Sequence, residues 1–193
     1  MSARSGASAK PQLLEILKAN SVRRGTFTLA SGVVSDLYVN CKLTTLDPKA
    51  ALLVGAVGWD LLRATAADLG IEIAAVGGLT MGADAIALSI GIAAELASPG
   101  NAPQTFIVRK ATKEHGTKKR IEGNFQTGDT VVVIDDVITT GGSTIQAIEA
   151  VEGEGGKVAF VLALVDRQEG GRANIEARGL PVVAIFTRAD VAA

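Results

Sequence analysis

The chain has 193 residues, of which 48% are hydrophobic and 4% aromatic, and its formal net charge is −1. This length suffices for one well-buried domain and is short for two, and aliphatic side chains must fill most of its core. The near balance of charge argues against a general nucleic-acid binder or a protein that lies on a membrane surface. The single cysteine, Cys41, excludes an internal disulfide and fits a reducing cytoplasm. We expect it to be a buried or semi-buried small residue rather than a nucleophile.

The N-terminal segment is expected to be a flexible tail followed by a short helix. Residues 1–10 are rich in serine, alanine and glycine with no apolar run behind them, so we find no targeting signal there. Pro11 is typical of a helix start. The helix should span residues 11–20 and bury an apolar face made of Leu13, Leu14, Ile16 and Leu17.

Two short β segments come next, before any alternation of strands and helices. One spans residues 26–32, and the other spans residues 35–40 and carries Tyr38. Because they precede the α/β part of the chain, we expect them to form an appendage over about residues 21–45. Tyr38 has two interpretations at this stage: it helps to enclose a ligand, or it covers the core of the hairpin.

The first α/β unit begins with a long helix, residues 48–69. Asp60, Arg63 and Asp68 interrupt its apolar residues, so the pattern indicates an amphipathic helix and not a membrane span. A strand at 72–76 leads through the glycine-containing loop 77–84 to a helix at 85–97. Backbone can approach a ligand closely at such glycines, but the loop is not G-x-G-x-x-G, so a dinucleotide fold is not indicated. A plain turn is the alternative.

A strand at residues 104–108 leads into a strongly basic segment. Six of the 19 Lys and Arg residues fall within residues 109–120, together with the single histidine. Composition alone is compatible with a solvated loop, a lid that meets a highly charged anion, or a nucleic-acid patch. A nucleic-acid patch is disfavoured because the segment has no aromatic residues and the chain is nearly neutral. The residues concerned are Arg109, Lys110, Lys113, His115, Lys118, Lys119 and Arg120.

The stretch at residues 130–151 has the most informative pattern. The apolar run 131–134 predicts a buried parallel strand, and Asp135 and Asp136 follow it. A Thr/Gly/Ser loop at 139–143 then opens a helix. Loop N–H groups, hydroxyls and a helix N-terminus favour phosphate, and the carboxylates suit sugar hydroxyls or hydrated Mg²⁺. This predicts a phosphorylated-sugar site; the alternative is an ordinary turn whose helix is capped by Ser143 or Thr144.

The C-terminal part adds one more candidate. A strand at 157–165 ends in the sequence D-R-Q-E, residues 166–169. An arginine at the carboxyl end of a parallel strand points into the crevice where open α/β sheets bind ligands, and its planar fork suits a carboxylate. Alternatively, Arg167 forms an ion pair with Asp166 or Glu169. A helix at 173–178, a strand at 181–186 and a tail at 187–193 complete the chain.

These elements predict an α/β fold: one domain over residues 1–193, with a central, mostly parallel sheet flanked by helices and a small N-terminal hood. Strands near residues 72, 104, 130, 157 and 181 alternate with helical stretches or loops. The functional loops all leave the carboxyl ends of strands, so they should converge on one crevice.

The sequence D-D-V-I-T-T-G-G-S at 135–143 resembles, over its full length, the phosphoribosyl pyrophosphate (PRPP) signature of the type I phosphoribosyltransferases. The resemblance implies that the two carboxylates hold the ribose hydroxyls and that the loop wraps the 5-phosphate. It names the sugar donor but not the acceptor base. The implied PRPP-binding residues are Asp135, Asp136, Val137, Ile138, Thr139, Thr140, Gly141, Gly142 and Ser143.

The N-terminal β segments resemble the hood of the orotate phosphoribosyltransferases. The shared pattern is F-x-L-x-S-G-x-x-S-x-x-Y at residues 27–38. In that family the hood helps to enclose the flat pyrimidine. This chain has Ala30 where many members carry a lysine, and Lys42 is a candidate substitute.

The basic segment is similar to the mobile catalytic loop of the same family, which closes over the pyrophosphate of PRPP. The match is R-K-x-x-K-x-H-G, and the loop would span about residues 109–122. The resemblance implies PRPP-binding roles for Arg109, Lys110, Lys113 and His115, the last two being catalytic together with Asp135 and Asp136. Beyond Gly116 the chain departs from the glycine-rich form of many members, so Lys118, Lys119 and Arg120 receive no role.

Two further sites follow from the resemblance. The D-R-x-E element implies that Arg167 holds the acid group of orotate, with Thr139 also at the orotate site. The loop at residues 78–82 would lie at the pyrophosphate.

The resemblance implies an Mg²⁺-dependent transfer of phosphoribose from PRPP to orotate, for pyrimidine biosynthesis. Mg²⁺ would be held through PRPP and water near Asp135 and Asp136. The family further implies a homodimer in which the loop at 109–120 reaches the partner's site. From the cysteine content and the charge balance we expect a cytoplasmic protein without nucleic-acid or membrane partners. Two alternatives are a phosphoribosyltransferase for another base, such as a purine, and a PRPP-sensing regulator that has lost catalysis.

Overall fold

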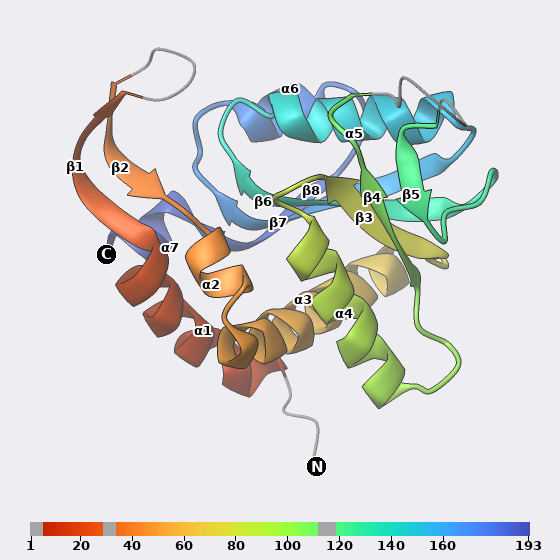
Figure 1. Cartoon of the computed structure of the whole chain (residues 1–193), viewed down its shortest axis with the longest axis horizontal. Helices are drawn as coiled ribbons and strands as arrows, with labels where there is room; N and C mark the ends of the chain where they lie inside the picture. Colours follow the sequence, from red (N-terminus) through yellow and green to blue (C-terminus); the bar gives the residue numbers. More distant parts are fainter. Residues whose placement is uncertain (1–5, 29–33, 112–118) are drawn as a thin grey trace.

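The computed structural model describes residues 6–28, 34–111 and 119–193. Among these residues, six strands form a central sheet in the order β5-β4-β3-β6-β7-β8 (Figure 1). Neighbouring strands are parallel except β5, which runs antiparallel to β4. The predicted mostly parallel sheet is therefore confirmed. The strands are β3 Ala75–Leu79, β4 Gln104–Val108, β5 Ile121–Gly123, β6 Thr130–Ile138, β7 Lys157–Asp166 and β8 Val182–Thr187.

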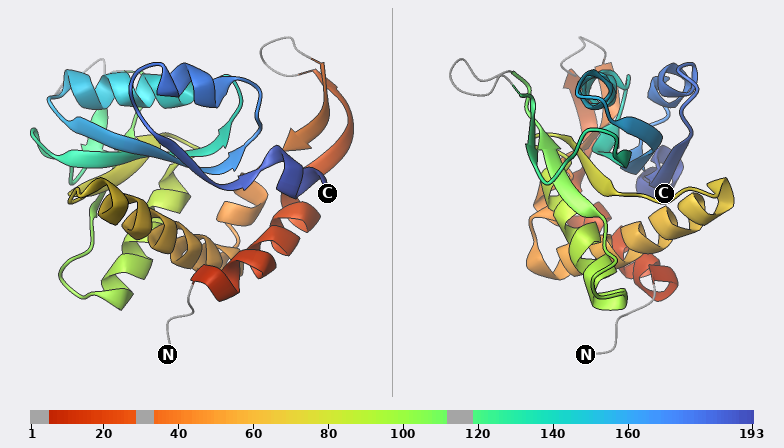
Figure 2. Two further views of the ribbon diagram at one scale, coloured as in Figure 1. Left: turned by 180° about the vertical axis from the view of Figure 1, so that it is seen from behind. Right: turned by 90° about the vertical axis from the view of Figure 1, so that its right-hand side faces the viewer.

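Helices cover both faces of the sheet (Figures 1 and 2). On one face lie α3 (Pro48–Leu69) and α4 (Asp84–Ala97), with α1 (Gly6–Ser21) packed against α3. On the other face lie α5 (Gly142–Gly153) and α6 (Gly171–Glu176). Side chains of β6 alternate between the two layers: Val132 and Ile134 join the α3–α4 core, and Val131 and Val133 join the α5–α6 core. This is the period-two pattern of a strand buried on both faces.

The hood is a separate two-stranded antiparallel sheet, as expected. It consists of β1 (Val22–Thr28) and β2 (Val34–Val39), which project beside the main sheet (Figure 1). The ring of Tyr38 packs against Phe27 with a centroid distance of 5.5 Å, and Tyr38 remains 44% exposed. The short helix α2 (Lys42–Thr45) then connects the hood to α3.

Within the described residues, helices extend closer to both chain ends than the sequence suggests. Helix α1 begins at Gly6, so the expected tail through residue 10 is wrong for residues 6–10. The Gly6 N–H donates to Asp60 Oδ2 at 2.8 Å, and a Cβ at Gly6 would lie 2.8 Å from that oxygen. Near the C-terminus, helix α7 (Arg188–Ala192) replaces the expected tail, because Thr187 and Asp190 form a capping box.

Strand β3 begins three residues later than expected, which places Gly77 and Gly78 inside it. A Cβ at Gly77 would lie 2.2 Å from the Phe106 carbonyl, and one at Gly78 would lie 2.0 Å from the Ile134 carbonyl. These glycines therefore serve the close packing of backbones within the sheet.

Helix α3 has the bounds that its sequence predicts. The side chain of Asp47 accepts a hydrogen bond from the Ala50 N–H at 2.8 Å, Pro48 opens the helix, and Gly70 ends it with φ of 65°. By length and composition α3 could cross a membrane. However, it packs against α1 and α4 and buries Leu53, Val54, Val57 and Leu62, as a core helix does.

Candidate active site

The carboxylate pair lies inside β6, near its carboxyl end. Asp135 is buried, and the Thr144 hydroxyl at the start of α5 donates a hydrogen bond to its Oδ2. Burial raises the pKa of Asp135 to about 7; the charge of Asp136 adds to this rise, and the Thr144 hydrogen bond opposes it. Asp136 is half-buried, so the two adjacent carboxyl groups have different environments.

Three segments meet at Asp136. Lys42 of α2 places its Nζ 3.3 Å from Asp136 Oδ2, and the Val137 N–H donates to Oδ1 at 3.0 Å. A Cβ at Gly82, in the β3–α4 loop, would lie 2.6 Å from Oδ1. The carboxylate is thus positioned between the hood connection and a second loop, and Lys42 adds a cation to the site.

Cys41 does not act as an exposed nucleophile. It is fully buried, and its Sγ donates to the Asp136 carbonyl at 3.6 Å. Burial raises the pKa of the thiol well above its ordinary value, and the nearby charge of Asp136 raises it further. The expectation of a buried small residue is confirmed.

The loop after β6 presents hydrogen-bond donors at the N-terminus of α5. Thr140, Gly142 and Ser143 are exposed, and Gly141 takes the left-handed conformation with φ of 83° at the helix start. The first turn of α5 contains no acidic side chain, so its N–H groups and the helix dipole favour an anion. Val137 packs against the α3–α4 core, and the Ile138 side chain is buried in the α5–α6 core. Because its side chain is fully buried, Ile138 can contribute to a ligand only through its backbone.

Helix α6 supports this loop from behind. The Gly171 N–H donates to the Thr139 carbonyl at 2.8 Å, and Asn174 Nδ2 donates to the Thr140 carbonyl at 3.0 Å. A Cβ at Gly171 would lie 2.4 Å from the Thr139 carbonyl. A glycine at this position thus lets α6 approach the loop closely.

The basic segment connects the antiparallel strands β4 and β5. The Arg109 N–H donates to the Arg120 carbonyl at 2.8 Å, and Arg109 Nη1 lies 3.3 Å from Glu122 Oε1. Lys110 is exposed beside them. The described ends of the segment are therefore paired at the base of a β4–β5 hairpin. Lys113 and His115, which were predicted to be catalytic, lie outside the described residues.

Arg167 follows β7 and is 2% exposed. Its Nη2 lies 2.7 Å from Glu169 Oε1, which is one of the ion pairs considered as an alternative in the sequence analysis. The Arg167 N–H donates to the Ile138 carbonyl at 2.9 Å, so the residue borders the segment that follows the carboxylate pair.

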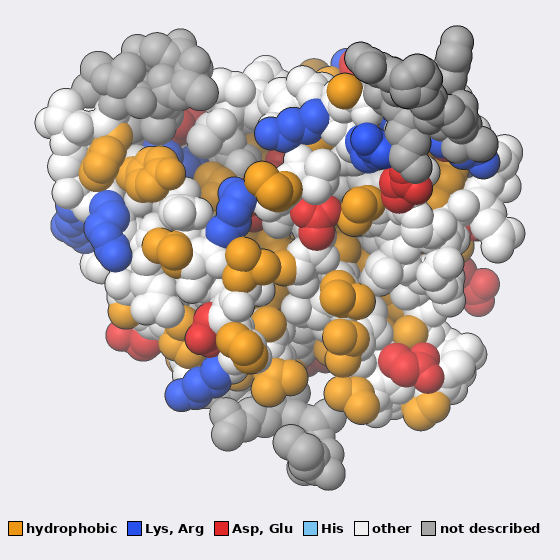
Figure 3. Space-filling model, in the orientation of Figure 1, with side chains coloured by type: hydrophobic (Ala, Val, Ile, Leu, Met, Phe, Trp, Pro, Cys, Tyr) orange, Lys and Arg blue, Asp and Glu red, His pale blue; other side chains and the backbone are white. Residues whose placement is uncertain are grey.

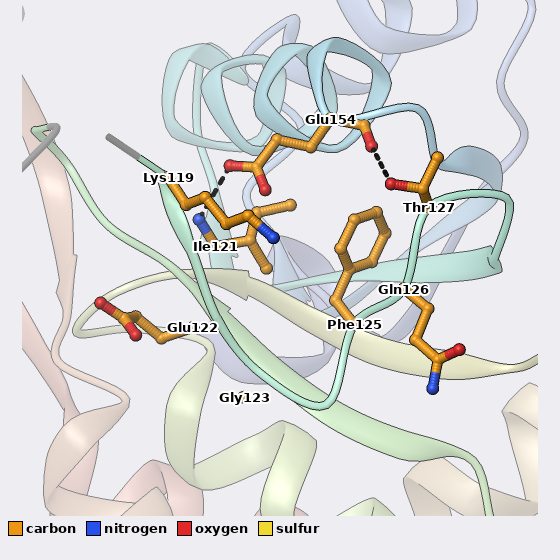
Figure 4. A pocket seen from close by; sticks show the side chains of 8 residues that line it. All are labelled: Lys119, Ile121, Glu122, Gly123, Phe125, Gln126, Thr127 and Glu154. Carbon is orange, nitrogen blue, oxygen red and sulfur yellow. Dashed lines mark hydrogen bonds between the residues drawn. The ribbon is translucent and has the colours of Figure 1, made fainter. Parts of the chain in front are cut away.

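A separate hollow of about 390 Å³ lies at the outer edge of the sheet, beside β5 (Figure 4). There Glu154 Oε1 accepts hydrogen bonds from the Arg120 and Ile121 N–H groups at 2.7 and 3.1 Å. The lining residues differ from those of the carboxylate site: Lys119, Ile121, Glu122, Gly123, Phe125, Gln126, Thr127 and Glu154.

Several residues that support the site carry no clear signal in the sequence. Thr144 was considered as a helix cap, whereas its hydroxyl bonds Asp135. Gly171 and Asn174 were not predicted as supporting residues, although the glycine at position 171 could have indicated the close approach of α6 to the loop. Of the glycines expected in the loop at 78–82, Gly78 belongs to the buried strand β3. Gly82 lies in the β3–α4 loop and adjoins Asp136.

Comparison with known proteins agrees with this geometry. The phosphoribosyl transferase domain family matches residues 82–179. A solved structure of the Mycobacterium tuberculosis orotate phosphoribosyltransferase in complex with PRPP is 36% identical, with a TM-score of 0.75 over 96% of this chain and 99% of that chain. Adenine phosphoribosyltransferase from Saccharomyces cerevisiae is 20% identical with a TM-score of 0.65, a likeness of fold. The fold and the carboxylate site thus define a phosphoribosyltransferase.

Comparison with curated relatives identifies the family of phosphoribosyltransferases to which the chain belongs. The orotate phosphoribosyltransferase of Rhodopirellula baltica is 40% identical over 92% of this chain and 91% of its own length. That of Streptomyces avermitilis is 45% identical over 88% of this chain and 89% of its own. The chain belongs to the orotate phosphoribosyltransferases.

Proposed function

We propose that this chain transfers the 5-phosphoribosyl group of PRPP to orotate, giving orotidine 5′-monophosphate and pyrophosphate, at the carboxyl end of β6. The observation that carries this proposal is the carboxylate pair Asp135 and Asp136 immediately before an exposed hydroxyl and N–H loop at the start of α5. Ribose hydroxyls can donate to the carboxylates, while the 5-phosphate accepts from the loop.

The reaction needs opposite charges to be stabilised at the two ends of the breaking bond. Displacement at the anomeric carbon passes through a ribosyl cation-like state, so positive charge grows on the ring and negative charge on the departing pyrophosphate. Asp136, held by Lys42 and the Val137 N–H, provides negative charge beside the ribose. A covalent nucleophile is not required.

Cations from the β4–β5 hairpin would stabilise the pyrophosphate. Arg109 and Lys110 leave the end of β4, and the family resemblance adds Lys113 and His115 from the same loop. Preorganised cations at a developing negative charge are the main catalytic contribution in such a site. Closure of the loop over the substrates would also exclude water that could hydrolyse PRPP.

The donor set suits Mg²⁺ carried largely by the substrate. In the part of the chain that the structure describes, no three His, Cys, Asp or Glu residues gather into a metal site. Asp135 and Asp136 offer hard carboxylate oxygens, and Mg²⁺ commonly takes one or two of these together with phosphate and water. When bound, the ion would neutralise charge on the pyrophosphate. Asp135 and Asp136 would orient it through water while they hold the ribose.

Orotate would be selected through its carboxylate at Arg167. The Arg167 guanidinium lies 2.7 Å from Glu169 Oε1, and this contact with a carboxylate within the protein supports the assignment. Arg167→Ala should therefore raise the KM for orotate about tenfold or more, because a charged hydrogen bond to orotate is lost. The KM for PRPP should stay nearly unchanged. Arg167→Lys keeps the charge but loses the fork, so it should lie between wild type and Arg167→Ala. Equal loss of both substrates in folded protein would contradict this assignment.

The proposed assembly is a cytoplasmic homodimer in which the hairpin loop reaches the partner's site. Leu88, Ile92 and Leu96 are exposed at four-residue spacing along α4. Figure 3 shows apolar side chains gathered over α2, α3 and α4 on the face seen in Figure 1. A second copy of the chain would remove this surface from water.

A base-consumption assay tests the function. Protein, PRPP and Mg²⁺ are mixed with orotate and, separately, with adenine, hypoxanthine or guanine, and loss of the base is followed. We expect loss of orotate and pyrophosphate release, and neither with the purines. Consumption of a purine in preference to orotate would support the purine enzyme, and PRPP binding without turnover would support a regulator.

A further inference from the structure

Two arginines lie at neighbouring strand ends on the carboxyl edge of the sheet. Asp166 of β7 pairs with Thr187 of β8, so the residues that follow them, Arg167 and Arg188, leave adjacent strands. The Thr187 N–H donates to the Asp190 carboxylate at 2.7 Å, which fixes the first turn of α7 and with it Arg188. Arg167 has a proposed role, whereas the sequence analysis assigned none to Arg188.

Glu169 lies between the two guanidinium groups. Its Oε1 is 2.7 Å from Arg167 Nη2 and 4.0 Å from Arg188 Nη1. Arg188 also places Nη2 2.5 Å from Asp36 Oδ1, on strand β2 of the hood. The Arg188 hydrogen bond lowers the pKa of Asp36, and the charge of Arg167 contributes to the same shift. Charges therefore alternate from the hood to the end of β7, in the order Asp36, Arg188, Glu169, Arg167.

The four groups differ greatly in exposure. The side chains of Arg167, Glu169, Arg188 and Asp36 are 2%, 26%, 31% and 80% exposed, respectively. Solvent screens the charge of Asp36 far more than those of the inner groups. Two guanidinium groups thus share one partly buried carboxylate. A carboxylate that is shared between two cations holds each of them less strongly than it would hold one, which eases its replacement by an anionic ligand.

We propose that Arg188 is a positioning residue that sets the preference for an acidic acceptor, because it shares Glu169 with Arg167. This inference rests on the proposed function, in which Arg167 receives the carboxylate of orotate. Without Arg188, Glu169 would compensate Arg167 alone. An arriving carboxylate would then meet a balanced ion pair and would have to compete with Glu169.

Steady-state kinetics of Arg188→Ala test the inference. We expect the KM for orotate to rise about five- to twentyfold, the usual size of a coupling between neighbouring charged groups. The KM for PRPP and the thermal midpoint should change little, because Arg188 is a partly exposed residue in a short terminal helix. Arg188→Lys retains the charge and should keep most of the orotate affinity.

Arg178→Ala is the matched control. Arg178 forms an ion pair of similar exposure with Glu149 of α5, at 2.6 Å, away from the hood. Arg178→Ala should change neither the KM for orotate nor the KM for PRPP.

Asp36→Asn separates electrostatics from mechanical support. It removes the exposed negative charge and leaves Arg188 in place, so the KM for orotate should stay the same or fall. If the Asp36–Arg188 contact merely holds the hood, Asp36→Asn and Arg188→Ala will raise this KM alike. That result, or an unchanged KM for orotate in Arg188→Ala, overturns the inference.

The Arg167 and Arg188 variants together distinguish a wrong role for Arg188 from a wrong acceptor site. If Arg167→Ala raises the KM for orotate and Arg188→Ala does not, Arg167 retains its role and Arg188 loses the one proposed here. If Arg167→Ala itself has no effect, the acceptor assignment fails first, and the inference fails with it.

Discussion

At the scale of single residues, the site depends on two adjacent carboxyl groups in unlike environments. Asp135 is buried and bonded by Thr144, whereas Asp136 is half-buried and paired with Lys42. Because burial raises the pKa of Asp135 to about 7, its carboxyl group can hold a proton near neutral pH, which lessens its repulsion with Asp136. The arrangement gives the free protein a pH dependence that can be measured.

The stability of the ligand-free protein should fall as pH rises from about 5 to 8. The pKa of Asp135 is raised from 3.8 to about 7, so the folded state binds the proton more tightly than the unfolded state. This contribution is fully present below the unfolded pKa and is lost as pH rises through the folded pKa, by at most about 4 kcal/mol. Chemical denaturation at several pH values measures it.

Asp135→Asn is the control for this pH dependence. It removes the titrating group, so the difference in unfolding free energy between pH 5 and pH 8 should shrink relative to wild type. An identical pH profile in the variant would show that other groups produce the slope.

At the scale of elements, the close contact of α6 with the loop after β6 can be tested by Gly171→Ala. The new Cβ would lie 2.4 Å from the Thr139 carbonyl and 2.6 Å from Ile138 Cγ2, so the loop must move. We expect a loss of about 1–3 kcal/mol in unfolding free energy, as for overpacking, and a raised KM for PRPP. Denaturation and steady-state kinetics measure the two effects.

Gly153→Ala provides the comparison at the other end of α5. A Cβ there meets nothing within 4 Å, so the variant should be as stable as wild type or more so, by up to about 1 kcal/mol. Its KM for PRPP should not change. If Gly171→Ala also binds PRPP normally, the loop does not depend on support from α6.

Elements with strong local signals were predictable, and short ones were not. The proline, capping aspartate and terminal glycine of α3 and the apolar run of β6 made these elements evident. The three-residue β5 and the four-residue α2 are too short for periodicity to reveal. The contact of Lys42 with Asp136 joins positions 94 residues apart, and local pattern carries no information on such a contact.

At the scale of the whole molecule, the site lies where separate parts of the chain converge. The hood, the β3–α4 loop, the β4–β5 hairpin and the ends of β6 and β7 all border the carboxyl edge of the sheet. The β4–β5 hairpin lies at one edge of the sheet, and α4 exposes Leu88, Ile92 and Leu96. A loop at the edge and an apolar face are compatible with a dimer in which each subunit completes the other's site.

Subunit complementation tests this arrangement. Lys113→Ala should remove the loop's contribution, and Asp136→Asn should damage the ribose site, so each variant alone should have little activity. In a mixed dimer, the Lys113→Ala subunit keeps an intact ribose site and receives an intact loop from its partner. Equal mixing with exchange of subunits should then restore about a quarter of wild-type activity, from one intact site in half of the dimers. If each loop serves its own subunit, no mixed dimer contains an intact site and mixing will restore nothing.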